Sequence, residues 1–175
     1  MIFPENTVLS NVCCELNLIL MTENEGFERA YRYCTAAEHC RSEVKAMLER
    51  HKTDVVSICH ILDQLEKEKF IDEKRYARAF VHDKLLFSRW GRIRISYALR
   101  QKRIPEDVIE EAISSIDQDE YDAVLSDVAD SFRRSVKGST DYERNMYLMK
   151  RICSRGFEPS IVSRFLRFSD SPDNQ

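Results

Sequence analysis

The stretch RIRISYALRQKRIPEDVIEEAISSI, residues 92–116, decides the fold, because its apolar pattern occurs three times in the chain. Fifty-one residues earlier, RSEVKAMLERHKTDVVSICHILDQL (41–65) places apolar side chains at the same seven positions without a gap. Fifty-three residues later, NMYLMKRICSRGFEPSIVSRFLRFS (145–169) keeps five of the seven apolar. A period of this length is typical of stacked structural repeats, whose terminal copies are often irregular. The seven positions are Val44, Met47, Leu48, Ile58, Ile61, Leu62 and Leu65, then Ile95, Ala98, Leu99, Ile109, Ala112, Ile113 and Ile116, then Leu148, Arg151, Ile152, Val162, Phe165, Leu166 and Ser169.

Capping and helix-breaking residues divide the first two copies into three helices each. In the first copy, helices are expected at about 26–38, 42–50 and 54–69, with Ser42 and either Thr53 or Asp54 as caps. In the second copy, Asp72 caps the opening helix and Gly91 precedes a helix at 92–102. Pro105 fits the first position of the helix that follows, where its missing N–H costs nothing.

The third copy shows the same punctuation. A long helix is expected to begin near Asp119, and Thr140 with Glu143 forms a capping-box pattern. Gly156 stands where a left-handed helix terminator is common, and Pro159 follows at a new helix start.

The sequence therefore predicts an all-α fold of three tandem three-helix repeats, at 23–71, 72–117 and 118–168, stacked in an elongated, curved array. Each helix pair around a tight turn is similar to a helix-turn-helix. No pair of alternating strands joined by a hairpin turn is found, so the units are wingless. An N-terminal extension at 1–22 and a disordered polar tail at 169–175 are expected around the repeats.

Several features indicate a cytoplasmic protein. No stretch of 18 consecutive apolar residues is present, so no membrane partner is expected. No lysine or arginine precedes Arg29, which is unlike a secretory signal, and Met21 is a candidate start. The six cysteines form no CxxC pair and are interpreted as reduced, mostly buried thiols.

Charge is sorted along the middle copy. Residues 84–103 contain seven basic residues and no acids, whereas residues 104–132 contain ten acids and no lysine or arginine. The whole chain has a formal charge of −3 and a pI of about 5.9, which disfavours non-specific nucleic-acid binding as its main role. A local basic surface remains compatible with that balance.

Arginine is enriched in the basic segment, and its forked side chain suits phosphate and carboxylate groups. On a helix, Arg92, Arg100 and Arg103 share one stripe beside Tyr97, with Trp90 just before the helix. Two interpretations stay open, a solvated helix face and a surface that binds anions or a partner. The candidate binding residues are Lys84, Arg89, Trp90, Arg92, Arg94, Tyr97, Arg100, Lys102 and Arg103.

Catalytic motifs are absent from the sequence. It has no GxxxxGK[ST], GxGxxG, HExxH or GxSxG pattern. The spacing of Cys34, His39, Cys40 and His60 matches no usual zinc pattern. We therefore expect no enzyme activity, no metal and no cofactor.

Three segments together make the chain similar to the RecX family of bacterial recombinase regulators. They are RSEVKAMLERHK (41–52), LEKEKFIDEKRYARAFVHDKL (65–85) and GRIRISYALRQKRI (91–104). The resemblance covers about residues 27–168. Where the family often has Lys-Gly, this chain has Lys102-Arg103 and His51-Lys52, which changes the helix ends and adds charge.

The resemblance implies that the chain modulates RecA. It implies a monomer that lies as a clamp in the groove of the RecA–DNA filament, where it limits filament growth, ATP hydrolysis and strand exchange. Single- or double-stranded DNA is expected to be a weak partner, because the pI is low. Two alternatives remain, a helix-turn-helix DNA-binding regulator and a helical protein–protein adaptor.

Overall fold

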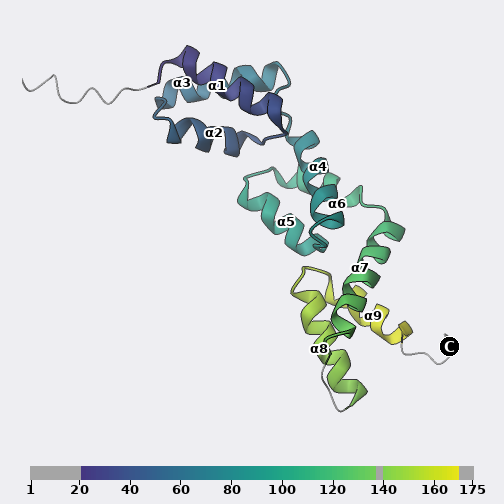
Figure 1. Cartoon of the computed structure of the whole chain (residues 1–175). Coiled ribbons are helices and arrows are strands. Elements are labelled where there is room, and N and C mark those ends of the chain that lie inside the picture. Colours follow the sequence, from purple (N-terminus) through teal and green to yellow (C-terminus); the bar gives the residue numbers. More distant parts are fainter. Residues whose placement is uncertain (1–20, 137–139, 170–175) are drawn as a thin grey trace, which may run out of the picture. The chain divides into compact units, whose positions relative to one another are not determined.

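The computed structural model describes residues 21–136 and 140–169. These residues form nine helices and no strand, apart from one isolated β-bridge between Met21 and Thr53, so the predicted all-α class is confirmed (Figure 1). The expected extension at 1–22 lies outside the described residues except for Met21 and Thr22, and the expected tail at 169–175 lies outside them except for Ser169, which ends α9. The helices are α1 (Glu23–Ala36), α2 (Arg41–Arg50), α3 (Val55–Lys67), α4 (Glu73–Leu86), α5 (Arg92–Gln101), α6 (Glu106–Ser114), α7 (Gln118–Arg133), α8 (Asp141–Cys153) and α9 (Pro159–Ser169).

Helix starts follow the capping residues in the sequence. Asp54 accepts hydrogen bonds from the N–H groups of Val56 and Ser57, and Asp72 caps α4. Thr140 forms the predicted capping box with Glu143. These side chains satisfy N–H groups that a helix leaves without partners in its first turn.

Three predicted helix starts are shifted by one to three residues. Helix α1 begins at Glu23 rather than near Gly26, because Thr22 with Glu25 makes a capping box three residues upstream. Helix α2 begins at Arg41, so Ser42 lies inside it. Pro105 precedes α6 instead of opening it, because its ψ of 144° is extended.

The repeat register is confirmed at the turn after the second helix of each copy. Lys52, Arg103 and Gly156 are separated by the repeat shifts of 51 and 53 residues, and all three have positive φ, at 59°, 62° and 93°. The register is also seen in the core, because Leu48, Leu99 and Ile152 are each fully buried.

The chain forms two compact units. The first comprises described residues 21–37 and 43–71, and the second comprises 38–42 and 72–169 with its gap at 137–139. In the first unit, α1 packs on α3. Its core is Ala30, Val44, Met47, Leu48, Ile58, Ile61, Leu62, Leu65 and Ile71.

The second unit contains six helices, α4 to α9, around one continuous core. Helix α4 contacts α5, α6 and α7, and α8 contacts α7 and α9. Tyr121 and Phe157 are fully buried in this core, with their ring centroids 5.2 Å apart. The two later three-helix groups therefore share a core, while the three repeat boundaries and the elongated array stay predictions.

Within the part of the chain that the structure describes, no helix is long and apolar enough to cross a membrane. In the same residues, no group of three or more His, Cys, Asp or Glu side chains is placed to hold a metal ion.

Candidate functional site

The basic segment folds into a stack of cations and aromatic rings on α4 and α5. Trp90 lies between two cations, with Arg94 Cζ 4.1 Å and Lys84 Nζ 5.4 Å from its ring centroid. Lys84 Nζ also lies 5.3 Å from the Phe80 ring, and Lys102 Nζ lies 5.6 Å from the same ring. The sequence thus places cations and rings alternately along this face.

Stacking of this kind limits the motion of long side chains. Each exposed cation–ring contact contributes about 0.5–1 kcal/mol. Lys102 has a second ring beside it, because its Nζ lies 5.8 Å from the Tyr76 ring. Ordering the cations before a partner arrives reduces the entropy lost on binding.

Arg92 has a different environment from its neighbours. Its side chain is only 19% exposed, its Cζ lies 3.9 Å above the Tyr121 ring, and its guanidinium lies 3.6 Å from Glu158. It also donates a hydrogen bond to Gln118. Arg92 therefore packs within the second unit with little of its side chain exposed, and its role in binding stays a prediction.

Tyr121 and Glu158 complete this cluster. The Tyr121 hydroxyl donates to the Glu158 carboxylate and accepts from the backbone N–H of Arg92 at 3.2 Å. Burial, together with the bond to Glu158, holds the pKa of Tyr121 well above its ordinary value. Neither partner was found from the sequence, because both are distant from the basic segment.

The N-terminal end of α5 docks on the turn between α8 and α9. The N–H of Gly91 donates to Arg155 O at 2.9 Å, and the N–H of Ile93 donates to Gly156 O at 3.0 Å. A Cβ added at Gly91 would lie 2.3 Å from the Gly156 carbonyl, and one added at Gly156 would lie 2.3 Å from Arg94 Cβ. The sequence by itself indicates only that Gly91 precedes a helix and that Gly156 ends one, and it does not predict this close packing.

Acidic partners for the basic segment come from the following helices. Arg89 pairs with Asp127 of α7 at 2.8 Å. Arg100 makes a forked ion pair with Glu106 of α6, which raises the pKa of Arg100 and lowers the pKa of Glu106. Acids from other parts of the sequence therefore lie beside Arg89, Arg92 and Arg100 in space, although residues 84–103 themselves contain none.

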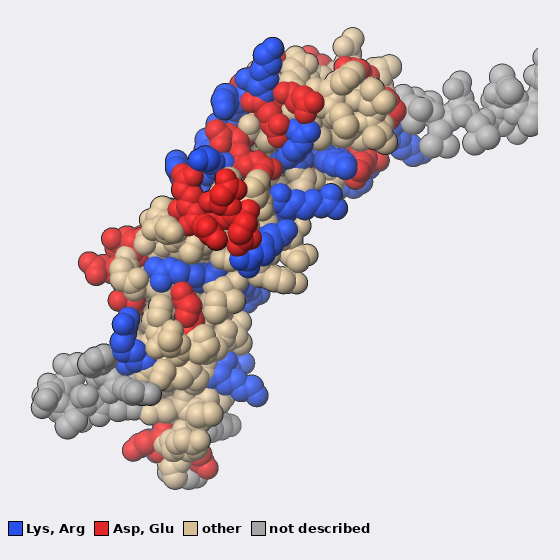
Figure 2. Space-filling model, turned by 180° about the vertical axis from the view of Figure 1, so that it is seen from behind, with Lys and Arg blue, Asp and Glu red and all other residues tan. Residues whose placement is uncertain are grey.

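The acidic segment is partly neutralised within the same unit. Glu111 of α6 pairs with Lys74 at 2.7 Å and with Arg78, both on α4. Hydrogen bonds from Lys74 and then Arg78 lower the pKa of Glu111. Basic and acidic side chains accordingly lie beside each other on the face in Figure 2.

Of the exposed members of the predicted set, Arg89 and Arg100 lie in the ion pairs described above, and the others are Arg94, Tyr97 and Arg103. Tyr97 is 61% exposed, and Ile93, one turn before it on α5, is 52% exposed. Arg103 is exposed just after α5 on a backbone with φ of 62°. We use the name α5 face for these exposed side chains of α5 and its C-terminal turn together with the stacked Lys84, Trp90 and Lys102.

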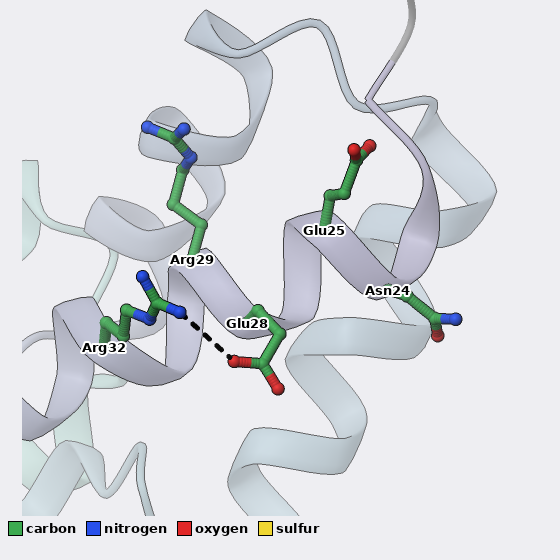
Figure 3. A pocket seen from close by; sticks show the side chains of 5 residues that line it. All are labelled: Asn24, Glu25, Glu28, Arg29 and Arg32. Carbon is green, nitrogen blue, oxygen red and sulfur yellow. Dashed lines mark ion pairs between the residues drawn. The ribbon is translucent and has the colours of Figure 1, made fainter.

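A second surface feature is a shallow depression along α1, lined by Asn24, Glu25, Glu28, Arg29 and Arg32. Figure 3 shows Glu28 and Arg32 turned toward each other, 3.8 Å apart. Hydrogen bonds from Thr22 lower the pKa of Glu25 and fix its carboxylate at the helix start. The residues that line this depression all come from one helix and are polar or charged, as is usual for a helix surface. They give no indication of a ligand-binding site.

Comparisons with known proteins identify relatives of this chain. A family model described as RecX, second three-helix domain, matches residues 72–113. The regulatory protein RecX of Leptothrix cholodnii is 31% identical over 143 residues, which are 81% of this chain and 87% of that protein. The regulatory protein RecX of Prosthecochloris aestuarii is 26% identical over 144 residues, which are 81% and 91% of the two chains.

Solved structures share the fold. The crystal structure of RecX from Lactobacillus salivarius has a TM-score of 0.77 at 19% identity, covering 85% of this chain and 96% of that one. A second structure, of regulatory protein RecX, has a TM-score of 0.76 at 20% identity, covering 83% and 73%.

Proposed function

The chain belongs to the RecX family of regulatory proteins, and from this membership we propose that it regulates the RecA recombinase by binding the RecA–DNA filament. Bound in the filament groove, it limits filament extension and so lowers DNA-stimulated ATP hydrolysis and strand exchange. The family membership carries this proposal. The α5 face supports it, because stacked cations beside exposed Ile93 and Tyr97 suit an acidic protein surface with apolar contacts.

We place the RecA contact at the outward-facing residues of the α5 face. Arg94 and Arg103 supply exposed charge, and Tyr97 supplies an amphipathic ring of the kind enriched at interfaces. Arg92 acts indirectly in this proposal, by holding α5 against Tyr121 and Glu158.

The helix-turn-helix alternative has less support. A recognition helix uses the residues of its N-terminal end to contact base edges. At the start of α5 the N–H groups of Arg92 and Ile93 bond to Tyr121 and Gly156, and the α8–α9 turn packs against that end. The packing of this turn favours a protein contact along the length of α5 over base reading from its tip.

The test is RecA's ATPase on single-stranded DNA with the purified chain added below the RecA concentration. Limiting filament extension predicts strong suppression at such amounts, because one blocked end affects many protomers. An unchanged ATPase would contradict the proposal. Suppression only at DNA-saturating amounts of the chain, with no binding to RecA, would assign the effect to competition for DNA.

The α5 face is tested by Arg94→Glu with Arg103→Glu, compared with the exposed Arg164→Glu on α9 as a control of equal charge change per site. We expect the double variant to remain folded and to lose suppression, and the control to keep it. The salt dependence of binding distinguishes a DNA contact from a RecA contact. Each lost phosphate contact lowers the slope of log affinity for single-stranded DNA against log salt concentration by about 0.7. An unchanged slope with weaker RecA suppression would assign the face to protein.

A further inference from the structure

The first turn of α3 carries two exposed apolar side chains. Val55 and Val56 are 75% and 64% exposed, whereas the next residue, Ser57, is buried. Valine loses side-chain freedom in a helix, and the positive end of the helix dipole favours acidic residues in the first turn. Neither propensity nor charge accounts for two valines at this place, so the reason for them lies outside the helix.

The valine pair occurs in the first copy of the repeat only. The first turn of α6 contains two acids, which the helix dipole stabilises, whereas the first turn of α3 contains none. The repeat shifts of 51 and 53 residues relate Val55 and Val56 to Glu106 and Asp107, and then to Pro159 and Ser160.

The chain enters the first unit beside this pair. Met21 forms a parallel β-bridge with Thr53, two residues before Val55. The entry is also held by Glu23, whose carboxylate accepts a hydrogen bond from Ser57 Oγ at 3.4 Å. Because consecutive Cα atoms are about 3.8 Å apart, the chain before Met21 starts at this edge of the unit.

A buried polar atom lies at the same edge. Thr53 is 7% exposed, and its Oγ1 has no hydrogen-bond partner among the residues that the structure describes. A buried hydroxyl without a partner is unfavourable, and native proteins contain few of them. Since Met21 is bridged to Thr53, the backbone just before Met21 starts within reach of this hydroxyl and can supply the partner.

The sequence before Met21 has the pattern that an apolar surface requires. As a helix, residues 8–20 would be about 20 Å long, which is enough to reach both valines from Met21. The segment contains no lysine or arginine. Its apolar side chains at helical spacing are Val8, Val12, Leu16, Ile19 and Leu20.

The first unit is also the smaller of the two. In the described residues it has three helices, and the second unit has six. A small unit buries a smaller fraction of its surface on folding, so an added apolar element contributes relatively more to its stability. The first unit therefore gains most from a further packed segment.

We propose that residues 8–20 of this chain pack through their apolar stripe against Val55 and Val56, and so extend the core of the first unit. This inference is independent of the proposed function, because the α5 face belongs to the second unit. Covering the two valines removes apolar surface from water. A segment attached next to its site has a high effective concentration there, and it avoids the entropy that a separate molecule loses on binding.

Hydrogen–deuterium exchange of the full chain, resolved to peptides by mass spectrometry, tests the proposal. Leu16→Ser alters the stripe, and Val55→Ser with Val56→Ser alters the surface that it covers. Leu18→Ser is the matched control, because at about 100° per residue Leu18 points away from the stripe. Circular dichroism verifies that every variant is folded.

We expect the backbone amides of residues 8–20 to exchange at least about tenfold more slowly than in an unstructured peptide, the factor for burial of one large apolar side chain. Leu16→Ser and the valine double variant should each remove this protection, and combining them should have no further effect. Leu18→Ser should keep it.

Three results would overturn the proposal. The first is exchange of residues 8–20 in the unaltered chain at the rate of an unstructured peptide. The second is protection that survives in the valine double variant, or that Leu16→Ser and Leu18→Ser reduce equally. The third is protection that disappears on dilution, which would assign the cover of the two valines to a second copy of the chain.

Discussion

The two ends of α5 carry the same residue type in opposite surroundings. At the N-terminal end, Arg92 is 19% exposed, lies on the Tyr121 ring and pairs with Glu158. Just beyond the C-terminal end, Arg103 is exposed on a left-handed backbone. The difference comes from the α8–α9 turn, which covers the first end through Gly156 and leaves the second uncovered.

This contrast shows that helix periodicity does not by itself define a binding surface. Arg92, Arg100 and Arg103 fall on one stripe by angle, yet the first is internal, the second is paired with Glu106, and the third is exposed. Whether an arginine is buried, paired or exposed depends on which element from a distant part of the sequence packs beside it. The predictions that follow test whether one end of α5 serves stability and the other serves binding.

The largest effect is expected at Gly156. In Gly156→Ala, the new Cβ lies 2.3 Å from Arg94 Cβ, and the backbone must keep a φ of 93° that alanine disfavours. Overpacking and the left-handed backbone together should lower the free energy of unfolding by roughly 2–5 kcal/mol. Urea denaturation followed by circular dichroism measures this loss.

Arg103→Ala is the control for Gly156→Ala, because it places alanine at the equivalent turn, where both the original and the new residue carry a Cβ on a left-handed backbone. Its stability should stay close to that of the unaltered chain. Ordinary surface substitutions change stability by up to about 0.5 kcal/mol. A loss no larger than this for Gly156→Ala would show that the α8–α9 turn accommodates the new Cβ, and that the N-terminal end of α5 is no more tightly packed than the C-terminal end.

The second effect concerns Arg92. Arg92→Ala removes a half-buried stacking contact and leaves Glu158 without its cation, so we expect a loss of about 2 kcal/mol. Arg100→Ala, which removes an exposed pair with Glu106, should change stability little. Equal losses in the two variants, measured by chemical denaturation, would remove the distinction between them.

The third effect is a pH dependence at the covered end. The folded-state pKa of Tyr121 is raised above its ordinary value of 10.0. The neutral hydroxyl therefore contributes its full stability below pH 10, and this contribution is lost as pH rises above 10, because the unfolded chain ionises first. At pH 11 the loss should be about 1 kcal/mol.

Tyr121→Phe provides the comparison for this pH dependence. Unfolding of both proteins between pH 8 and 11 should show a steeper decline in the unaltered chain. Parallel curves would place Tyr121 in an environment open to water and would contradict the covered end of α5.

The fold could be predicted well from the sequence, because the repeat depends on residues that act locally. Asp54, Asp72 and Thr140 cap their helices as expected, and the register through Leu48, Leu99 and Ile152 is buried throughout. Capping and apolar periodicity operate within a few helical turns. The shifted starts, at α1 and α6, came from a competing cap and from the extended ψ of Pro105.

The candidate site could be predicted only in part. Its location on α4 and α5 followed from the charge run, whereas the pairing of Arg89 with Asp127 and of Arg92 with Glu158 depends on contacts between residues more than 35 positions apart. Patterns within a few helical turns of sequence cannot predict those contacts. The available signal was the rarity of glycine, because Gly91 before α5 and Gly156 in the α8–α9 turn are two of only four glycines in the chain.

The smallest effect, and the sharpest test of the exposed end, is Arg103→Gly. Arg103 has a φ of 62°, in a region that favours glycine, and its repeat equivalent in the third copy is Gly156. Relief of that backbone strain, less the extra chain entropy of glycine, should stabilise the protein by about 0.5–1 kcal/mol. Strained residues that persist in a fold often mark functional positions, so the same variant should bind the RecA filament more weakly while melting at a higher temperature. Lys52→Gly supplies the comparison in the first unit, since Lys52 has a φ of 59° at the equivalent turn but lies outside the α5 face. It should gain similar stability and keep its binding. If Arg103→Gly gained stability and bound the RecA filament as tightly as the unaltered chain, the Arg103 side chain would not contact RecA. The contact would then be made by Arg94 and Tyr97.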